Sequence, residues 1–411
     1  MRILWASHLV PYPPKSGVHI RSYNLLRGVA AKHDVDLLAF VQEPWLKAFY
    51  GSREEALEEC ERELLRFCRS VRFLPIDRLA RPGGKWRTAV EGLIYPQSYT
   101  TRWLSSRDAG EAFAQAARTE SYGLAHFDTI SLAPFRAFFP GTVATLGHHN
   151  IESHLLQRRA LSERSLLKRW YFLEEGRRVA RYEKKIAGSF AAHIACSTLD
   201  CERLRAIAPH ANAVTIPNGV DVDYFRPASG ANRAASVIFV GSLNWYPNVD
   251  AVLFLLDKVW PVLKARVPDL RLDVVGTAPP QAILERAASL PDVTIHGFVS
   301  DVRPFMESAA VYVCPIRDGG GTKLKILDAF SMRKCVVAHP IACEGIDVEP
   351  GRHVQFADSP QAFVREIERL LQDPDSRERM GTAARQLVLE RYTFSQIAGR
   401  LCEVFEEVAG G

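Results

Sequence analysis

The sequence predicts two α/β units, each built around a doubly wound parallel sheet. Its 411 residues exceed what one compact core usually holds, because single domains mostly contain about 100–200 residues. From Ser236 onward, short β-branched apolar runs alternate with amphipathic helical patterns, which is typical of βαβ units. Both halves begin with a strand, a turn-rich loop (Ser7–Gly17 and Ser242–Asn248) and a helix. We therefore expect two Rossmann-like units that bind ligands at the carboxyl ends of their strands.

The C-terminal half has the clearer pattern. Helices are expected over Val249–Leu263, Gln281–Leu290 and Leu324–Met332, where apolar residues recur at three- and four-residue steps. Strands are expected at the short apolar runs Val237–Gly241, Leu272–Gly276, Val293–Gly297, Val311–Pro315, Cys335–Ala338 and His353–Phe356.

The N-terminal half follows the same order less regularly. A helix is expected over Val18–Ala31. The expected strands are Ile3–Ala6, Val35–Phe40, Ala125–Phe127, Val143–Leu146, His193–Cys196 and Val214–Ile216. Between the halves, residues 227–235 (PASGANRAA) have no periodicity and suit a linker. We place the first unit in residues 1–226 and the second in residues 236–389.

Composition excludes several classes of protein. Hydrophobic residues make up 47% and charged residues 24%, as in a globular chain and unlike a disordered one. The longest uncharged stretch, Ala137–Ile151, is too short and too interrupted to span a membrane. The net charge of +5 is too small for a dedicated nucleic-acid binder. It is compatible with an anionic ligand.

The N-terminus and the cysteines indicate a cytoplasmic protein. The first apolar run ends at prolines without a small-residue cleavage site, so we expect no secretory signal. The eight cysteines form no CxxC pair and no tight cluster with histidines, which favours reduced thiols over a metal site.

The segment Arg317–Asp328 (RDGGGTKLKILD) is the most informative. Its three glycines allow close approach of the backbone to a ligand, and Thr322 is a candidate N-cap for the helix that follows. Free N–H groups at a helix start attract anions, and a bound diphosphate would favour Lys323 and Lys325 in the first turn. Asp328 follows on nearly the same face and could accept ribose hydroxyls. The alternative is a glycine-rich surface turn with solvated lysines.

Five segments in order, together with this loop, resemble glycosyltransferase family 4, retaining enzymes of the GT-B fold. They are Pro13–Gly17, His149–Glu152, Val214–Asp221 with Phe225–Pro227, Val240–Leu243 and His296–Val299. The resemblance covers essentially the whole chain. It implies two Rossmann-like units facing each other across a cleft, with the last helix, within residues 390–411, packing back on the first unit.

The resemblance also implies that the second unit binds a nucleotide-diphosphate sugar. Asp328 would grip the ribose, and Phe298 and Val299 would border the base. The donor-binding set is then Gly241, Phe298, Val299, Gly319, Gly320, Gly321, Thr322, Lys323, Lys325 and Asp328. Two features depart from the family: Gly320 stands where its first motif glutamate falls, and Trp245–Asn248 replaces its Lys-Gly pair. We infer that Lys325, helped by Lys323, provides the charge for the phosphates.

The expected catalytic residues are His149, Lys325 and Glu152. By the resemblance, His149 contacts the donor sugar, Glu152 orients it or the acceptor, and the leaving phosphate takes the acceptor proton. Neither a protein general base nor a metal is then required. Lys15, Ser16, Gly17 and Arg21 form the expected acceptor and diphosphate loop of the first unit. Taken alone, His149 is also explained as a capped loop histidine and Lys15 as a solvated surface residue.

Two DxD triplets raise the alternative of a metal-dependent enzyme. Asp34 and Asp36 open an apolar strand, however, and Asp221 and Asp223 lie in the passage already assigned. His126 and Asp128 lie at a strand end, where a structural or acceptor-side role is favoured over metal binding. We therefore expect no metal and no other cofactor.

Residues Arg158–Lys185 carry the basic excess of the chain. Ten lysines and arginines stand against four glutamates in 28 residues, a net charge of +6, and leucines and aromatic residues recur between them at helical spacing. Such a stretch can dock on anionic lipid. The alternative is a solvated helix whose apolar residues pack on the first unit.

The sequence thus predicts a cytoplasmic, metal-independent GT-B glycosyltransferase of polysaccharide biosynthesis, peripheral on the membrane. Its partners would be a nucleotide sugar and a glycan or lipid-linked acceptor, without nucleic acid. A GT-B epimerase is one alternative, although no acid/base carboxylate pair stands out. A nucleotide-sugar-binding scaffold without catalysis is the other, because of Gly320.

Overall fold

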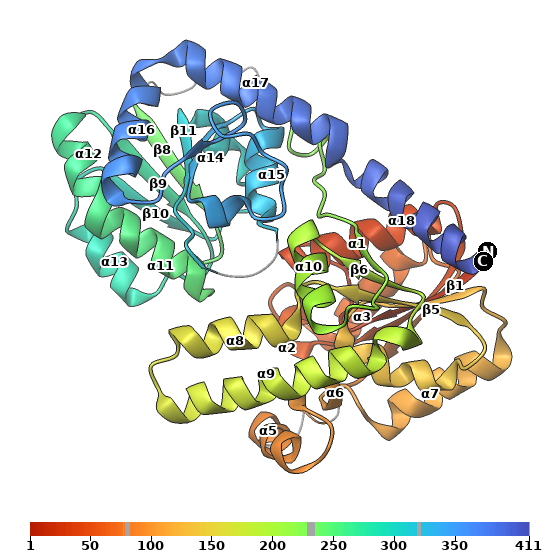
Figure 1. The fold of residues 1–411 in the computed structure, drawn as a ribbon. Helices are drawn as coiled ribbons and strands as arrows, with labels where there is room; N and C mark the ends of the chain where they lie inside the picture. The colour runs from red at the N-terminus through yellow and green to blue at the C-terminus, as the bar shows by residue number, and fades with distance from the viewer. Residues whose placement is uncertain (77, 79–82, 228–234, 319–321, 411) are drawn as a thin grey trace. The chain divides into compact units, whose positions relative to one another are not determined.

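The chain folds into two units, each described here by itself. A computed structural model describes all residues except 77, 79–82, 228–234, 319–321 and 411 (Figure 1). The first unit comprises Met1–Pro217 and Phe394–Gly411, and the second Asn218–Thr393.

The first unit contains a seven-stranded parallel sheet with the order β3-β2-β1-β4-β5-β6-β7. The strands are β1 (Arg2–Ser7), β2 (Asp34–Phe40), β3 (Ser70–Leu74), β4 (Leu124–Phe127), β5 (Val143–His148), β6 (Ala192–Ala195) and β7 (Ala213–Thr215). The order reverses between β1 and β4, so loops after these strands meet at a topological switch point.

Helices cover both faces of this sheet. They are α1 (Gly17–Ala30), α2 (Glu43–Leu46), α3 (Arg53–Leu64), α5 (Gly84–Ile94), α6 (Tyr99–Arg102), α7 (Arg107–Thr119), α8 (Glu152–Ser162), α9 (Leu166–Ile186), α10 (Thr198–Ile207) and α18 (Phe394–Gly410), with short turns η1 (Ile130–Phe138) and η2 (Ala187–Ser189). The basic stretch Arg158–Lys185 is not one helix, because the structure divides it between α8 and α9.

The second unit contains a six-stranded parallel sheet with the order β10-β9-β8-β11-β12-β13. The strands are β8 (Ser236–Val240), β9 (Arg271–Val275), β10 (Val293–Gly297), β11 (Val311–Cys314), β12 (Cys335–Ala338) and β13 (Gln355–Phe356). All six expected strands of this half are confirmed within a few residues. The switch point lies between β8 and β11.

Helices again flank the sheet. They are α11 (Tyr246–Phe254), α12 (Trp260–Arg266), α13 (Gln281–Ala288), α14 (Arg303–Ser308), α15 (Leu324–Ser331), α16 (Pro360–Gln372) and α17 (Pro374–Arg391), with a π-helical turn η3 (Leu255–Val259) and a 3-10 turn η4 (Pro340–Cys343). Their apolar faces join the strands in one core that includes Phe239, Trp260 and Phe363.

The boundary between the two units lies earlier in the sequence than the composition suggests. The change falls at Pro217 and Asn218, not at residues 227–235, whose greater part lies outside the described residues. Backbone pairing explains the difference, because the Val220 N–H donates to the Tyr392 carbonyl (2.8 Å) within the second unit. The final helix α18 packs on α1, with Phe405 against Trp5 in the core of the first unit.

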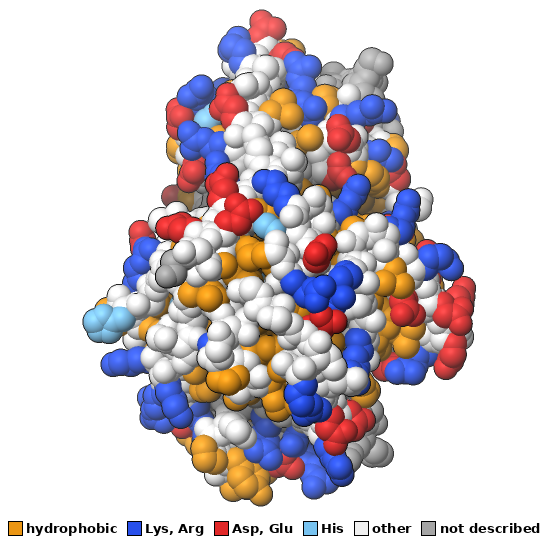
Figure 2. All heavy atoms as spheres, turned by 90° about the vertical axis from the view of Figure 1, so that its right-hand side faces the viewer, with side chains coloured by type: hydrophobic (Ala, Val, Ile, Leu, Met, Phe, Trp, Pro, Cys, Tyr) orange, Lys and Arg blue, Asp and Glu red, His pale blue; other side chains and the backbone are white. Residues whose placement is uncertain are grey.

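The surface and the cysteines add two observations. On the face drawn in Figure 2, acidic and basic side chains are interspersed, so no charge of one sign dominates there. All eight cysteines lie among the described residues, and each is buried and unpaired by a disulfide. Among the described helices, none is both long enough and apolar enough to cross a bilayer.

Candidate functional site

In the second unit, the predicted donor-binding residues gather at the switch point. Gly241 directly follows β8, and α15 follows β11 after a loop whose residues 319–321 lie outside the described part. Between them, Lys325 donates from Nζ to Oδ1 of Asn248 (2.6 Å). The structure thus joins the start of α15 to the first turn of α11, which follows β8 at the edge of the sheet where open α/β sheets bind ligands.

The side-chain amide of Asn248 holds Lys325 in this position. Its side chain is buried, and its Nδ2 donates to the carbonyl of Ser242 (2.6 Å). One amide therefore holds both the loop after β8 and the ammonium of Lys325. Sequence analysis noted Asn248 only as part of a segment that replaces a family motif. Its distance from Lys325, 77 residues along the chain, left no local signal of the contact.

Glycines permit the close packing around Lys325. A Cβ on Gly241 would overlap the Nζ atom of Lys325, and a Cβ on Gly276 would overlap the carbonyl oxygen of Gly241. The requirement at Gly241 is therefore steric. Its place in the donor-binding set stays a prediction.

Burial shifts both ionisable groups at the start of α15. It lowers the pKa of Lys325 to about 8, while Cys314 and Asp328 act in the opposite direction. It also raises the pKa of Asp328, with Lys325 opposing the change. Each group therefore lacks full compensation for its charge, and a ligand that brings opposite charge or hydroxyl donors would supply it.

The N-cap of α15 differs from the expectation. Lys323, not Thr322, occupies the N-cap position, and no side chain caps the helix there. Thr322 is buried, with its carbonyl oxygen 3.5 Å from Nδ2 of Asn218. The predicted donor residues Gly319, Gly320 and Gly321 lie outside the described residues.

The predicted base-binding residues follow β10. Gly297 adopts a φ of +64°, a conformation that favours glycine, and turns the chain away from the strand. Phe298 is left exposed, whereas Val299 packs against the core. Of the two predicted base-binding residues, Phe298 is therefore the one whose side chain is open to a ligand.

In the first unit, three side chains meet at the carboxyl ends of β1, β4 and β5. Asp128 Oδ1 lies 3.3 Å from Nε2 of His149, and its Oδ2 lies 3.9 Å from Nδ1 of His8. Ser22 Oγ donates to the same Oδ2 (2.7 Å). Gly147 allows the approach, because a Cβ there would stand 2.7 Å from the Asp128 carbonyl oxygen.

Charge in this cluster resides on the carboxylate. Burial, and then the neighbouring His149, lowers the pKa of His8 to about 4 against the effect of Asp128, so His8 is neutral near pH 7. Burial acts most strongly and alone would raise the pKa of Asp128, but the effects of His149, His8 and His126 together outweigh burial and lower the pKa below its ordinary value. An ionised carboxylate thus orients His149.

Glu152 is expected to orient His149 or the acceptor; the structure places Asp128 beside His149, and the role of Glu152 toward the acceptor stays a prediction. It begins α8, and the nearby Glu183 of α9 accepts hydrogen bonds from the Ser153 backbone N–H (3.4 Å) and hydroxyl. Burial, reinforced by Glu183, raises the pKa of Glu152 to about 7. The partner of His149 is Asp128, which sequence analysis had assigned to a structural or acceptor-side role.

The predicted loop of the first unit divides into exposed and buried members. Lys15 and Gly17 are exposed, and Ser16 Oγ lies 2.7 Å from Nδ1 of His19. Contrary to the expectation, the Arg21 side chain does not face an anion site. Its guanidinium is buried and donates to the carbonyls of Ile216 and Pro217 (both 2.8 Å), the end of the first unit's main segment.

Comparison with known proteins identifies the enzyme class. Residues 234–373 match the family model of glycosyl transferases group 1. The phosphatidyl-myo-inositol mannosyltransferase of Mycobacterium tuberculosis is 30% identical over 240 residues, 55% of this chain and 61% of that protein. The chain is a GT-B glycosyltransferase. Its two parallel sheets, one in each unit, confirm the doubly wound α/β fold class that the sequence predicts.

Other relatives match the glycosyltransferase over its whole length. An uncharacterized 44.6 kDa protein in the cps region of Klebsiella pneumoniae is 22% identical, over 89% of this chain and 90% of that protein. Sucrose-phosphate synthase of Thermosynechococcus elongatus shares the fold with a TM-score of 0.70 at 17% identity, covering 100% of both chains. Anabaena HepE does so with a TM-score of 0.66 at 15% identity, covering 99% of both.

The acidic triplets have structural roles in the glycosyltransferase. Asp36 is buried and paired with Arg69 (2.9 and 2.6 Å), while Asp221 accepts from the backbone N–H groups of residues 223 and 224. Among the residues that the structure describes, His8, Asp128 and His149 form the group whose geometry could hold a metal ion, with ligand atoms within 4.8 Å of one another.

Proposed function

We propose that the glycosyltransferase moves a sugar from a nucleotide-diphosphate sugar to an acceptor with retention of configuration and without a metal. The observation that carries the proposal is the Lys325–Asn248 contact beside Gly241, which places a cation with a shifted pKa at the switch point of the second sheet. The fold supports the donor class, since Anabaena HepE, which shares it, was solved with UDP and glucose and with UDP-glucose.

The chemistry requires charge stabilisation more than proton abstraction. The bond between the anomeric carbon and the diphosphate oxygen breaks, and a bond to the acceptor oxygen forms on the same face. The acceptor proton passes to the departing phosphate oxygen, so no protein base is consumed. Lys325 and the backbone N–H groups at the start of α15 would stabilise the charge that develops on the diphosphate.

The first unit would supply the polar contacts to sugar hydroxyls. His149, oriented by Asp128, is suited to bind a hydroxyl through its imidazole ring. His8 extends the same polar set, its ring centroid 5.4 Å from that of His149. A metal at these three residues would give the enzyme a chelator-sensitive step. We expect EDTA to leave the transfer rate unchanged, whereas a fall restored by a divalent cation would contradict metal independence.

The acceptor is proposed to be a glycan or a lipid-linked glycan of polysaccharide biosynthesis, reached at an anionic membrane. The support comes from residues 164–170, the α8–α9 tip. All seven are exposed, and Arg164, Lys168 and Arg169 alternate with Leu166, Leu167 and Trp170. Leu166, Leu167 and Trp170 are 81%, 76% and 54% exposed, whereas Tyr171 and Leu173 further along α9 are half-buried, so the alternative of apolar packing applies only beyond the tip. Cations among exposed leucines and tryptophan suit an anionic lipid surface.

A calorimetric panel of UDP, GDP and ADP with their sugars tests the donor class. We expect one nucleotide to bind and its sugar to be consumed when an acceptor is added, with release of the nucleotide. Binding without turnover across lipid-linked and soluble glycans would favour the non-catalytic scaffold. Conversion of the sugar without acceptor would favour the epimerase.

A further inference from the structure

Helix α5 buries its small residues and exposes its large apolar ones. Trp86, Val90 and Ile94 recur at four-residue steps on one face, and Trp86 and Ile94 are 75% and 73% exposed. The residues that it buries are Gly84, Thr88 and Gly92. An amphipathic helix of a globular protein normally has the opposite arrangement. The exposed stripe is therefore a surface that the first unit does not itself use.

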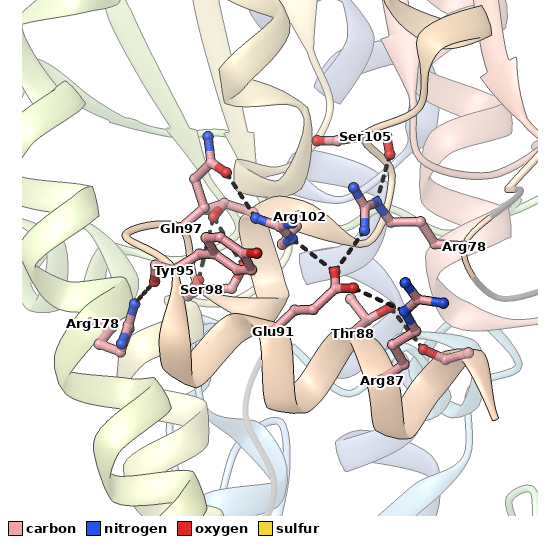
Figure 3. A network of polar contacts seen from close by, with 12 residues as sticks. Arg78, Arg87, Thr88, Glu91, Tyr95, Gln97, Ser98, Arg102, Ser105 and Arg178 are labelled. Carbon is pink, nitrogen blue, oxygen red and sulfur yellow. Dashed lines mark hydrogen bonds and ion pairs between the residues drawn. The ribbon is translucent and has the colours of Figure 1, made fainter.

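The inverted orientation is fixed by close packing. A Cβ at Gly92 would stand 2.7 Å from the backbone nitrogen of Tyr99, so this side of α5 fits tightly against the start of α6. Glu91 provides a second anchor, since its carboxylate binds Arg78 (2.8 Å), Arg87 (3.1 Å) and Arg102 (3.3 Å), as Figure 3 shows. Rotation that buried Trp86 would break both contacts.

Helix α9 holds the C-terminal end of α5. Arg178 donates to the carbonyls of Leu93 (2.9 Å) and Tyr95, the latter drawn in Figure 3. The buried carboxylate of Glu175 accepts from the backbone N–H groups of Tyr99 and Thr100 (3.2 and 2.9 Å). Glu175 and Arg178 follow Trp170 of the α8–α9 tip by five and eight residues, about 8 and 12 Å along the helix at 1.5 Å per residue. The stripe and the tip thus belong to one rigid assembly of helices.

The charge around the stripe identifies its occupant. Lys85 and Arg87 flank Trp86 and are exposed, and the carboxylate of Glu91 is already paired with arginines. The nearby tip adds three exposed cations and has no acidic residue in positions 164–170. Cations around exposed tryptophan, leucine and isoleucine side chains complement an anionic bilayer, where aromatic rings settle at headgroup level.

We propose that the α5 stripe and the α8–α9 tip form one composite surface that docks the enzyme on an anionic lipid bilayer. The α5 stripe inserts its apolar side chains, and the tip adds apolar contacts and most of the electrostatic attraction. The inference depends on the membrane part of the proposed function and names a second structural element for it.

The test is vesicle binding by the full chain. The α5 variant W86S/V90S/I94S is compared with V262S/L284S/L389S, which replaces three exposed apolar helix residues of the second unit. On phosphatidylcholine vesicles containing phosphatidylglycerol, we expect the α5 variant to bind about tenfold more weakly or worse. The matched control should bind as the parent does. Equal binding by the α5 variant and the parent would overturn the proposal.

The tip variant R164Q/K168Q/R169Q and a nucleotide-sugar titration distinguish a failure of the α5 proposal from a failure of the proposed function. We expect the tip variant to lose most binding to the anionic vesicles and its dependence on salt. If it does so while the α5 variant binds normally, the membrane function stands and the role of α5 falls. If the parent binds nucleotide sugar but no vesicle, both membrane proposals fail and the donor site does not. A parent dimer that the α5 variant dissociates without lipid would assign the stripe to a second copy and overturn the proposal.

Discussion

The ammonium of Lys325 lies 2.6 Å from the amide oxygen of Asn248, and that amide donates in turn to the carbonyl of Ser242. The two contacts link α15 to the first turn of α11, and through Ser242 to the loop after β8, at the switch point of the second sheet. Burial lowers the pKa of Lys325, so the cation is held where it lacks full compensation for its charge. The Asn248 oxygen orients the lysine but carries no formal charge to neutralise it.

Replacing Lys325 by methionine should weaken nucleotide-sugar binding. Methionine keeps much of the length and apolar volume of the lysine stem but loses the charge-assisted contact, which is worth about 1.5–3 kcal/mol. Calorimetry should therefore show a dissociation constant raised by about 10- to 150-fold. Lys258→Met, at an exposed lysine of the same unit, is the matched control and should change nothing. Unaltered affinity in Lys325→Met would remove this lysine from the site.

Donor binding should take up protons around pH 8. The pKa of Lys325 is lowered to about 8 in the free protein, and an adjacent diphosphate should raise it again. At pH 8 the lysine would gain roughly half a proton on binding, so affinity should fall as the pH rises through this value. Titration in buffers of different ionisation enthalpy measures the uptake.

Two variants assign the proton. Lys325→Met should abolish the uptake, whereas Asp328→Asn should retain or increase it, because any proton that the carboxylate loses on meeting ribose hydroxyls subtracts from the net uptake of the parent. Uptake that survives in Lys325→Met would place the titrating group elsewhere.

Asp128→Asn should lower kcat by about 10²-fold or more while donor affinity changes little. The substitution keeps the shape of the side chain but removes the charge that orients His149 and accepts the Ser22 hydroxyl proton. Initial rates at saturating donor, beside a nucleotide titration, separate the two effects. Asp34→Asn, at an exposed aspartate of the same unit, is the control. A normal kcat would reduce Asp128 to a structural residue.

Much of the fold could be predicted because buried parallel strands are short continuous apolar runs. Edge strand β3 could not be predicted in this way. Its residues alternate in exposure and include Arg72, so they form no continuous apolar run. The boundary at Pro217 was missed for another reason. It depends on backbone pairing of Val220 with Tyr392, which composition does not record.

The site was predicted where position along a strand sufficed. His149 and Asp128 each follow a strand of the first sheet, and the rule that carboxyl ends share one edge could have paired them. Asn248 and Arg21 required coordinates, because their partners lie 77 and about 195 residues away. The exposed face of α5 could not be predicted either, since the periodicity of Trp86, Val90 and Ile94 is that of an ordinary buried stripe.

Gly28→Ala should destabilise the first unit through the contact between α1 and α18. A Cβ at position 28 would overlap the Cβ of Ala398, so the two helices would have to separate, at a cost of about 1–3 kcal/mol for overpacking. The double variant Gly28→Ala/Ala398→Gly should recover most of this loss, because it moves the methyl group across the same contact. Gly399→Ala, one residue along α18, meets no atom within 4 Å and should be neutral or stabilising by up to about 1 kcal/mol from helix propensity. Denaturant unfolding of the parent, Gly28→Ala, Ala398→Gly and the double variant measures the coupling between positions 28 and 398, with Gly399→Ala as the control. Additive effects in the double variant would show that α18 does not meet α1 at this point.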